Sequence, residues 1–117
     1  MSRPAAGTIV LVDWRTGAVP SEPTRIRPAV VVEDDEIFPD AYPNTLVTPL
    51  TRDESFAYEA FSERIDPTPE NGADATSWAL AHHVMSVSLR RVQATPSRVT
   101  AEQLLSLRRR IALAIGL

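Results

Sequence analysis

The segment RIRPAVVVE, residues 25–33, predicts a strand of the fold. Its run of four small apolar residues, 29–32, is typical of a buried strand. Pro28 has no N–H group to donate to a neighbouring strand, so we expect it near the start of the strand or at a sheet edge. Arg25 and Arg27 stand at the mouth of this strand, where a charge needs a partner. They form either a solvated strand end or a contact for an anion.

The flanking segments predict further strands and loops. Residues 7–14, GTIVLVDW, are apolar and β-branched and are followed by turn formers, so we expect a strand and then a loop. Residues 34–44 are acidic and contain two prolines, which predicts another loop. The remaining predicted elements are strands at 45–50 and 56–61, a flexible turn at 66–74, and either one long strand or two short ones at 77–88.

The C-terminal residues predict one amphipathic helix. Thr100 followed by Gln103 matches a capping box at a helix start. Apolar residues recur at helical spacing through 104–115, and Gly116 suits the helix end. Five to seven short antiparallel strands closed by one helix indicate a mainly β fold. The spacing of the strands favours a small barrel, which removes exposed sheet edges.

Length and composition favour one globular domain over residues 1–117. Apolar residues make up 44% of the chain, which is enough for one modest core. No apolar run approaches the roughly 20 residues of a membrane span, and no signal peptide is recognisable. We therefore expect a cytoplasmic protein without membrane contact. The sequence contains no Cys, so no disulfide or thiolate site is expected, and we predict neither a metal nor another cofactor.

The net charge of −3 is unevenly distributed. Residues 52–76 carry two Arg against seven Asp or Glu, which gives −5, whereas residues 77–117 carry six Arg against one Glu, which gives +5. Such a local field can attract phosphate even when the total charge is negative. Arg90 and Arg91, which follow the predicted strand at 77–88, are better candidates for that contact than the triple arginine at 108–110.

These segments, in this order, resemble the MazF/PemK family of toxin–antitoxin ribonucleases. The resemblance runs from Gly7 to Leu117 through GTIVLVDW (7–14), SEP (21–23), RPAVVV (27–32), TPLT (48–51), SWALAHHVMSV (77–87) and a helix ending IGL. It implies a small SH3-like antiparallel barrel with a terminal helix, and a homodimer. It also implies metal-independent cleavage of single-stranded RNA, and a cognate antitoxin whose extended segment covers the RNA groove.

The resemblance assigns the functional arginine of the family to Arg27 and its functional threonine to Thr51. The Ser-Glu loop residues of the family correspond to Ser21 and Glu22, which we expect to bind RNA. Arginine suits charge stabilisation because its planar fork donates to two phosphate oxygens. A threonine hydroxyl could hold a phosphate oxygen or orient the 2′-hydroxyl of the RNA. Arg25 shares the strand face of Arg27 and is either a contact for a neighbouring phosphate or solvated.

His82 and His83 depart from the family pattern, which commonly has an acidic or neutral residue followed by Gln. Adjacent residues of a strand face opposite sides, so we expect at most one histidine in a given site and no metal held by the pair. A histidine near its ordinary pKa is an apt general acid or base. His83, at the Gln position, is therefore the candidate for proton transfer. The alternative places one histidine in the core and the other in solvent.

Alternatives exist for the arginine, for the aromatic residues and for the function. Arg27 could pair with Glu22 or Asp35 and only cap its strand. Trp14 and Trp78 could stack on bases, but we expect both in the core, and we expect the triple arginine at 108–110 to be a solvated helix face. The alternative functions are a gyrase poison of the CcdB type, which relies on a tryptophan near its C-terminus that this chain lacks, and a non-catalytic SH3-like binding module.

Overall fold

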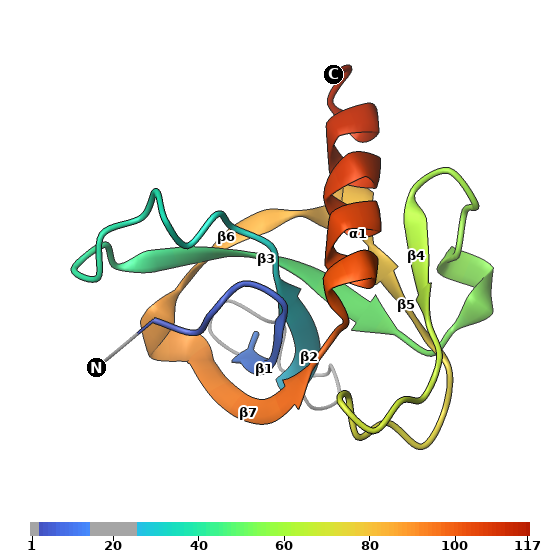
Figure 1. Ribbon diagram of the computed structural model, residues 1–117, viewed down its shortest axis with the longest axis horizontal. Coiled ribbons are helices and arrows are strands. Elements are labelled where there is room, and N and C mark those ends of the chain that lie inside the picture. The colour runs from blue at the N-terminus through green and yellow to red at the C-terminus, as the bar shows by residue number, and fades with distance from the viewer. Residues whose placement is uncertain (1–2, 15–25) are drawn as a thin grey trace.

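The computed structural model describes residues 3–14 and 26–117 (Figure 1). Within these residues the chain forms seven strands, three short 3-10 helices and one α-helix. The strands are β1 (Thr8–Asp13), β2 (Ile26–Val31), β3 (Asn44–Thr51), β4 (Ser62–Ile65), β5 (Ser77–Leu80), β6 (Met85–Ser88) and β7 (Val92–Arg98). The helices are η1 (Glu54–Phe56), η2 (Ala81–His83), η3 (Leu89–Arg91) and α1 (Ala101–Ala114). A mainly β class with a C-terminal helix is confirmed.

All strand pairs of the sheet are antiparallel, in the order β4-β5-β3-β2-β1-β7, and β6 also pairs with β3. Strand β3 connects the two halves of the sheet. Its first part pairs with β2 and β6, whereas its last two residues, Leu50 and Thr51, pair with β5. Figure 1 shows β3 crossing the molecule from the β6 side to the side where β4 and β5 stand. The end of β3 therefore lies where the two halves meet.

The second half of β2, residues 29–31, is buried on both faces, which accounts for its continuous apolar run. Val30 and Val32 belong to one core cluster, together with Leu50, Ile65, Ala79, Ala81, Val99 and Leu107. Ala29 and Val31 belong to a second cluster, together with Val10, Val12, Val47 and Val87. Because side chains alternate along a strand, one short segment contributes to both clusters.

Helix α1 begins at the predicted capping box. The Thr100 hydroxyl accepts the Gln103 N–H at 3.0 Å, and the Gln103 side chain accepts the Thr100 N–H at 2.9 Å. Leu107 is fully buried against the sheet. Gly116 follows the helix with a φ of +88°, which a residue without a side chain adopts most readily. Across the described residues no helix is long and apolar enough to pass through a membrane.

A buried ion pair ties the start of the chain to the end of β2. Arg3 Nη2 lies 2.8 Å from Glu33 Oε1, and the two side chains are only 6% and 0% exposed. Arg3 also donates to the carbonyl oxygens of Tyr42 and Asn44, while Glu33 accepts the Thr45 hydroxyl. These hydrogen bonds satisfy both charges and hold the 34–43 loop against β3.

One predicted element is wrong, one is confirmed in the second of its two forms, and one strand was not predicted. Residues 56–61 are not a strand: they contain the end of η1 and a turn, and the strand follows as β4. The segment 77–88 forms two strands, β5 and β6, separated by η2, which confirms the second of the two options. Strand β7 was not predicted, because VQATPSR contains Pro96 and few apolar residues.

The triple arginine at 108–110 is not a uniform solvated face. Arg108 donates to the carbonyl oxygens of Val32 and Glu33, at 3.0 and 2.6 Å. Arg110 Nε donates to Glu63 at 3.0 Å. Of the three, only Arg109 is exposed. Two of these arginines therefore attach α1 to the exit of β2 and to β4, a role that the helical periodicity alone does not reveal.

Candidate active site

Arg27 and Thr51 line one pocket, with a volume of about 330 Å³. Its floor is apolar and includes Leu50 and Ile65, which also belong to the core. Residues of the 66–76 loop form a wall, and Asn71 holds that loop in shape. The Asn71 side chain is buried and bonds the N–H groups of residues 68 and 73 and the carbonyl oxygen of residue 66. The pocket thus combines an apolar floor, formed by core residues, with a polar rim.

The pairing of β2 with β3 explains why the two predicted residues meet. Ala29 pairs with Pro49 and Val30 with Thr48. The same antiparallel register, extended by two residues, sets Arg27 opposite Thr51. Side chains opposed in this way point to one face of the sheet, with their Cβ atoms roughly 5 Å apart.

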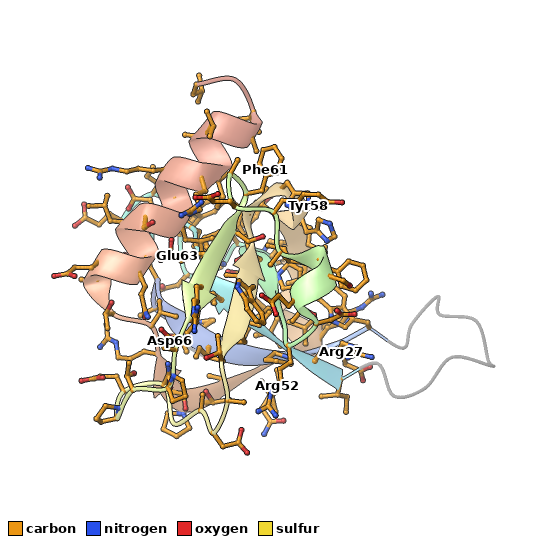
Figure 2. All side chains as sticks on the ribbon, turned by 90° about the vertical axis from the view of Figure 1, so that its right-hand side faces the viewer. Arg27, Arg52, Tyr58, Phe61, Glu63 and Asp66 are labelled. Atoms are coloured by element: carbon orange, nitrogen blue, oxygen red, sulfur yellow. The ribbon has the colours of Figure 1, made fainter. Side chains whose placement is uncertain are left out.

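Arg27 is exposed, and its guanidinium forms no hydrogen bond or ion pair with any residue that the structure describes. Asp35, one of the two carboxylates considered as its partner, instead accepts the Ala6 N–H at 3.0 Å. The other, Glu22, lies outside the described residues. A strand cap through Asp35 is therefore not formed. In Figure 2 Arg27 and Arg52 lie on the same side of the molecule, away from Tyr58.

Thr51 keeps its hydroxyl proton available for a ligand. Its Oγ1 atom accepts the Asp53 N–H at 3.1 Å, so the O–H remains free to donate to a phosphate oxygen. Asp53 in turn caps η1, and its hydrogen bonds from the Ser55 hydroxyl and N–H lower the pKa of Asp53. Thr48, three residues before Thr51, is on the opposite face of β3 and is fully buried.

Arg52 is a second cation at this pocket, and it was not predicted from the sequence. Its guanidinium lies 2.6 Å from Asp74, and the two side chains are 66% and 83% exposed. An ion pair this exposed contributes only about 0–1 kcal/mol, so Arg52 can exchange Asp74 for a bound anion. The sequence signal that could have identified Arg52 is its position directly after Thr51.

His82 and His83 lie in η2 and not on a strand, so the expectation that they face opposite sides is wrong. Both are exposed, and their ring centroids are 4.3 Å apart. Partial burial against Phe61 and Tyr58, with a smaller contribution from the charge of His83, lowers the pKa of His82. His83 does not line the pocket of Arg27 and Thr51. Within the described part of the chain, no three His, Asp or Glu side chains are grouped to hold a metal ion.

Arg90 and Arg91 line a separate pocket of about 260 Å³ at the start of β7. Ile26, the residue before Arg27, lines this pocket as well, so the two arginines lie near the start of β2. Arg90 is exposed and Arg91 is half-buried. The remaining predicted RNA-binding residues, Ser21, Glu22 and Arg25, lie outside the described residues.

The two tryptophans have different environments. Trp14 is half-buried and packs against the core cluster of Val10 and Val12, as expected. Trp78 was also expected in the core, but among the described residues it belongs to neither core cluster. It lines a third pocket between β4, β5 and η1, together with Tyr58. The reason is its place on the short strand β5, where the next residue, Ala79, faces the core and Trp78 faces the opposite side.

Comparison with known proteins identifies the class of protein that this fold and pocket define. The model of the family described as "PemK-like, MazF-like toxin of type II toxin-antitoxin system" matches residues 5–115. The chain belongs to this family. Among curated proteins, no sequence matches the chain.

Solved structures share the fold. The Mycobacterium tuberculosis toxin MazF-mt6 is 17% identical, with 94% of this chain and 97% of that chain covered and a TM-score of 0.71. MazF from Deinococcus radiodurans is 24% identical, with 97% of each chain covered and a TM-score of 0.69. An endoribonuclease in complex with its cognate antitoxin, from a mycobacterial species, is 14% identical, with 100% and 97% covered and a TM-score of 0.68.

Proposed function

We propose that this chain is a metal-independent endoribonuclease that cleaves single-stranded RNA at specific sequences and thereby inhibits translation and growth. The observation that carries the proposal is the pairing of Arg27 with Thr51 in one pocket. The guanidinium has no partner among the described residues, and the hydroxyl has a free proton. Membership of the toxin family supports the same function.

The geometry suits cleavage by the 2′-hydroxyl of the RNA itself. The 2′-hydroxyl gives up its proton and its oxygen attacks the adjacent phosphorus, the bond from phosphorus to the 5′-oxygen breaks, and the leaving oxygen takes up a proton. Arg27 donates to the non-bridging oxygens as negative charge develops on them, while Thr51 donates its hydroxyl proton to one of these oxygens. Arg27 does not act as the base, because a guanidinium stays protonated in proteins. The products are a 2′,3′-cyclic phosphate and a 5′-hydroxyl.

His83 remains our candidate for proton transfer, although it lies outside the pocket of its own chain. In a homodimer it would act on the RNA from the second subunit. Exposed apolar residues at the end of α1 support dimer formation: Leu113, Ile115 and Leu117 are 58%, 64% and 86% exposed. We propose a cognate antitoxin as the other partner, and the cytoplasm as the location where RNA and antitoxin meet the protein. No cofactor is part of the proposal.

Cleavage of a single-stranded RNA by the purified protein tests this function. We expect wild-type protein and Arg109→Ala, an exposed control arginine, to cleave equally, and Arg27→Ala to be strongly impaired. A parallel gyrase supercoiling assay tests the CcdB-type alternative. If wild-type protein inhibits gyrase and leaves RNA intact, the proposal is wrong. If it does neither and still binds RNA, the non-catalytic module is correct.

A further inference from the structure

A pocket of about 330 Å³ beside Trp78 lies outside the site described above. We propose that it binds one nucleobase of the RNA strand whose phosphate lies at Arg27 and Thr51, and that it prefers bases with an exocyclic amino group, cytosine, adenine or guanine, over uracil. This inference rests on the proposed ribonuclease function. The volume of the pocket is at the lower end of the range for small-ligand pockets, roughly 300–1,000 Å³, and suits a single base.

Strand register joins this pocket to the candidate active site. Thr51 pairs with Trp78 across β3 and β5, and Trp78 pairs with Arg64 across β5 and β4. Directly opposed residues point to the same face of an antiparallel sheet. Thr51, Trp78 and Arg64 therefore form a continuous row, and a strand of RNA leaving Thr51 along this row reaches the indole next. Figure 2 looks onto this side of the molecule.

A buried hydroxyl without a partner indicates that the pocket receives a ligand. Ser62 is only 6% exposed, and its Oγ finds no hydrogen-bond partner in the part of the chain that the structure describes. Ser62 also lines the pocket. Buried polar groups in proteins are almost always hydrogen-bonded. A base edge entering the pocket would supply the missing bond.

The other lining side chains define the chemistry of the ligand. The indole of Trp78 and the ring of Tyr58 offer apolar faces on which a base can stack. The carboxylates of Glu54 and Glu59 are exposed and accept hydrogen bonds, which favours amino groups on the base edge. Arg110 also lines the pocket, but its guanidinium is already paired with Glu63 at 3.0 Å. Arg64, whose ion pair with Asp66 is largely exposed, can then contact the next phosphate.

Two buried hydroxyls provide a matched pair of variants for the test. Ser62 and Thr48 both lack a hydrogen-bond partner among the described residues, but of the two only Ser62 lines this pocket. Removing an unsatisfied buried hydroxyl leaves stability unchanged or increases it. We therefore expect Ser62→Ala and Thr48→Val to melt no lower than wild type. A second pair is Trp78→Ala and Phe56→Ala, the latter an exposed aromatic residue outside the pocket.

Binding is measured by fluorescence anisotropy with labelled 2′-O-methyl octamers of C, A and U, which cannot be cleaved because the nucleophile is blocked. We expect Ser62→Ala and Trp78→Ala to weaken binding of the C and A octamers roughly ten-fold and that of the U octamer less than two-fold. The two control variants should bind all three octamers as wild type does. Equal effects on all octamers, wild-type binding by Ser62→Ala, or the same loss in Thr48→Val would overturn the inference.

Two further outcomes separate this inference from the proposed function and from a protein ligand. If the protein cleaves no RNA but Ser62→Ala still loses binding of the C and A octamers, the base pocket stands and the nuclease proposal falls. If Ser62→Ala and Trp78→Ala cleave a natural RNA with wild-type kcat/KM, the nuclease stands and the pocket assignment falls. If an arginine-rich peptide quenches Trp78 fluorescence and none of the octamers does, the pocket binds a basic protein segment instead.

Discussion

Thr51, the last residue of β3, lies directly opposite Trp78 on β5. The two residues are 27 positions apart in sequence, and each lines a different pocket. Because opposed residues of antiparallel strands share a face, this one pair joins the candidate phosphate site at Arg27 to the candidate base pocket. The functional surface proposed for this toxin-family protein therefore follows a row across the sheet.

Replacement of Arg27 by alanine should reduce single-turnover cleavage about 100-fold or more, because the donors that stabilise the charged phosphate are lost. Stability should change by less than about 0.5 kcal/mol, as expected for an exposed side chain without a described partner. Arg27→Lys should not restore full activity, since an ammonium cannot donate as a planar fork. Cleavage and thermal melting on the same preparations test this. An Arg27→Ala protein that melts early yet cleaves at the wild-type rate would show that Arg27 only caps its strand.

Chelation with EDTA should leave cleavage unchanged, because in the proposed mechanism the 2′-hydroxyl of the RNA is the nucleophile and Arg27 supplies the positive charge. The products should carry a 2′,3′-cyclic phosphate or its hydrolysed 3′-phosphate, together with a 5′-hydroxyl. Mass spectrometry of the fragments distinguishes these ends. Fragments with 5′-phosphates, or activity that returns only with added magnesium, would exclude this mechanism.

Arg3→Ala should destabilise the protein by about 3–5 kcal/mol, because it leaves the buried Glu33 carboxylate without its cation. Replacing both partners with methionine should cost far less, since no uncompensated charge then stays buried. Denaturant unfolding of both variants measures the difference. Cleavage per folded molecule should stay at the wild-type level, the reverse of the result expected for Arg27→Ala. Similar destabilisation by the single and double variants would contradict this account.

Stability should fall as the pH is lowered below about 6.5, the ordinary pKa of histidine. Burial lowers the pKa of folded His82, so the unfolded chain binds the proton first and unfolding is favoured in acid. The stabilising contribution of neutral His82 is fully present above the pKa that this histidine has in the unfolded chain. It is lost as the pH falls through the lower pKa of His82 in the folded protein. Melting temperatures of wild type and His82→Asn between pH 5 and 8 test this. Parallel curves for the two proteins would show that His82 contributes nothing.

The two variants used for octamer binding, Ser62→Ala and Thr48→Val, should both melt at or above the temperature of the wild-type protein. The free energy of unfolding should rise by at most about 1 kcal/mol in each variant, because an unsatisfied hydroxyl is removed from the interior. Calorimetry on the two proteins measures it. A clear drop for Ser62→Ala would indicate that its hydroxyl has a partner in the free protein.

Local chemistry made several features readable from the sequence. The apolar run of β2 consists of consecutive residues, and the capping box of α1 requires only Thr100 and Gln103. The resemblance to the toxin family placed Arg27 and Thr51 by motif, and both residues line one pocket. The strand and the helix start are confirmed, because each depends on neighbours along the chain, whereas the roles of Arg27 and Thr51 stay predictions.

Tertiary structure alone decided the rest. The bend of β3 places Thr51 beside Trp78, and no local pattern specifies a pairing over that distance. The η2 turn, and not a strand, sets both histidine rings side by side. From its place on the helix Arg108 was expected in solvent, but in the folded chain it donates to the carbonyl oxygens of the two residues after β2. For Thr51 and for Arg108 the deciding interaction joins residues distant in sequence, and it forms only after the sheet has brought them together.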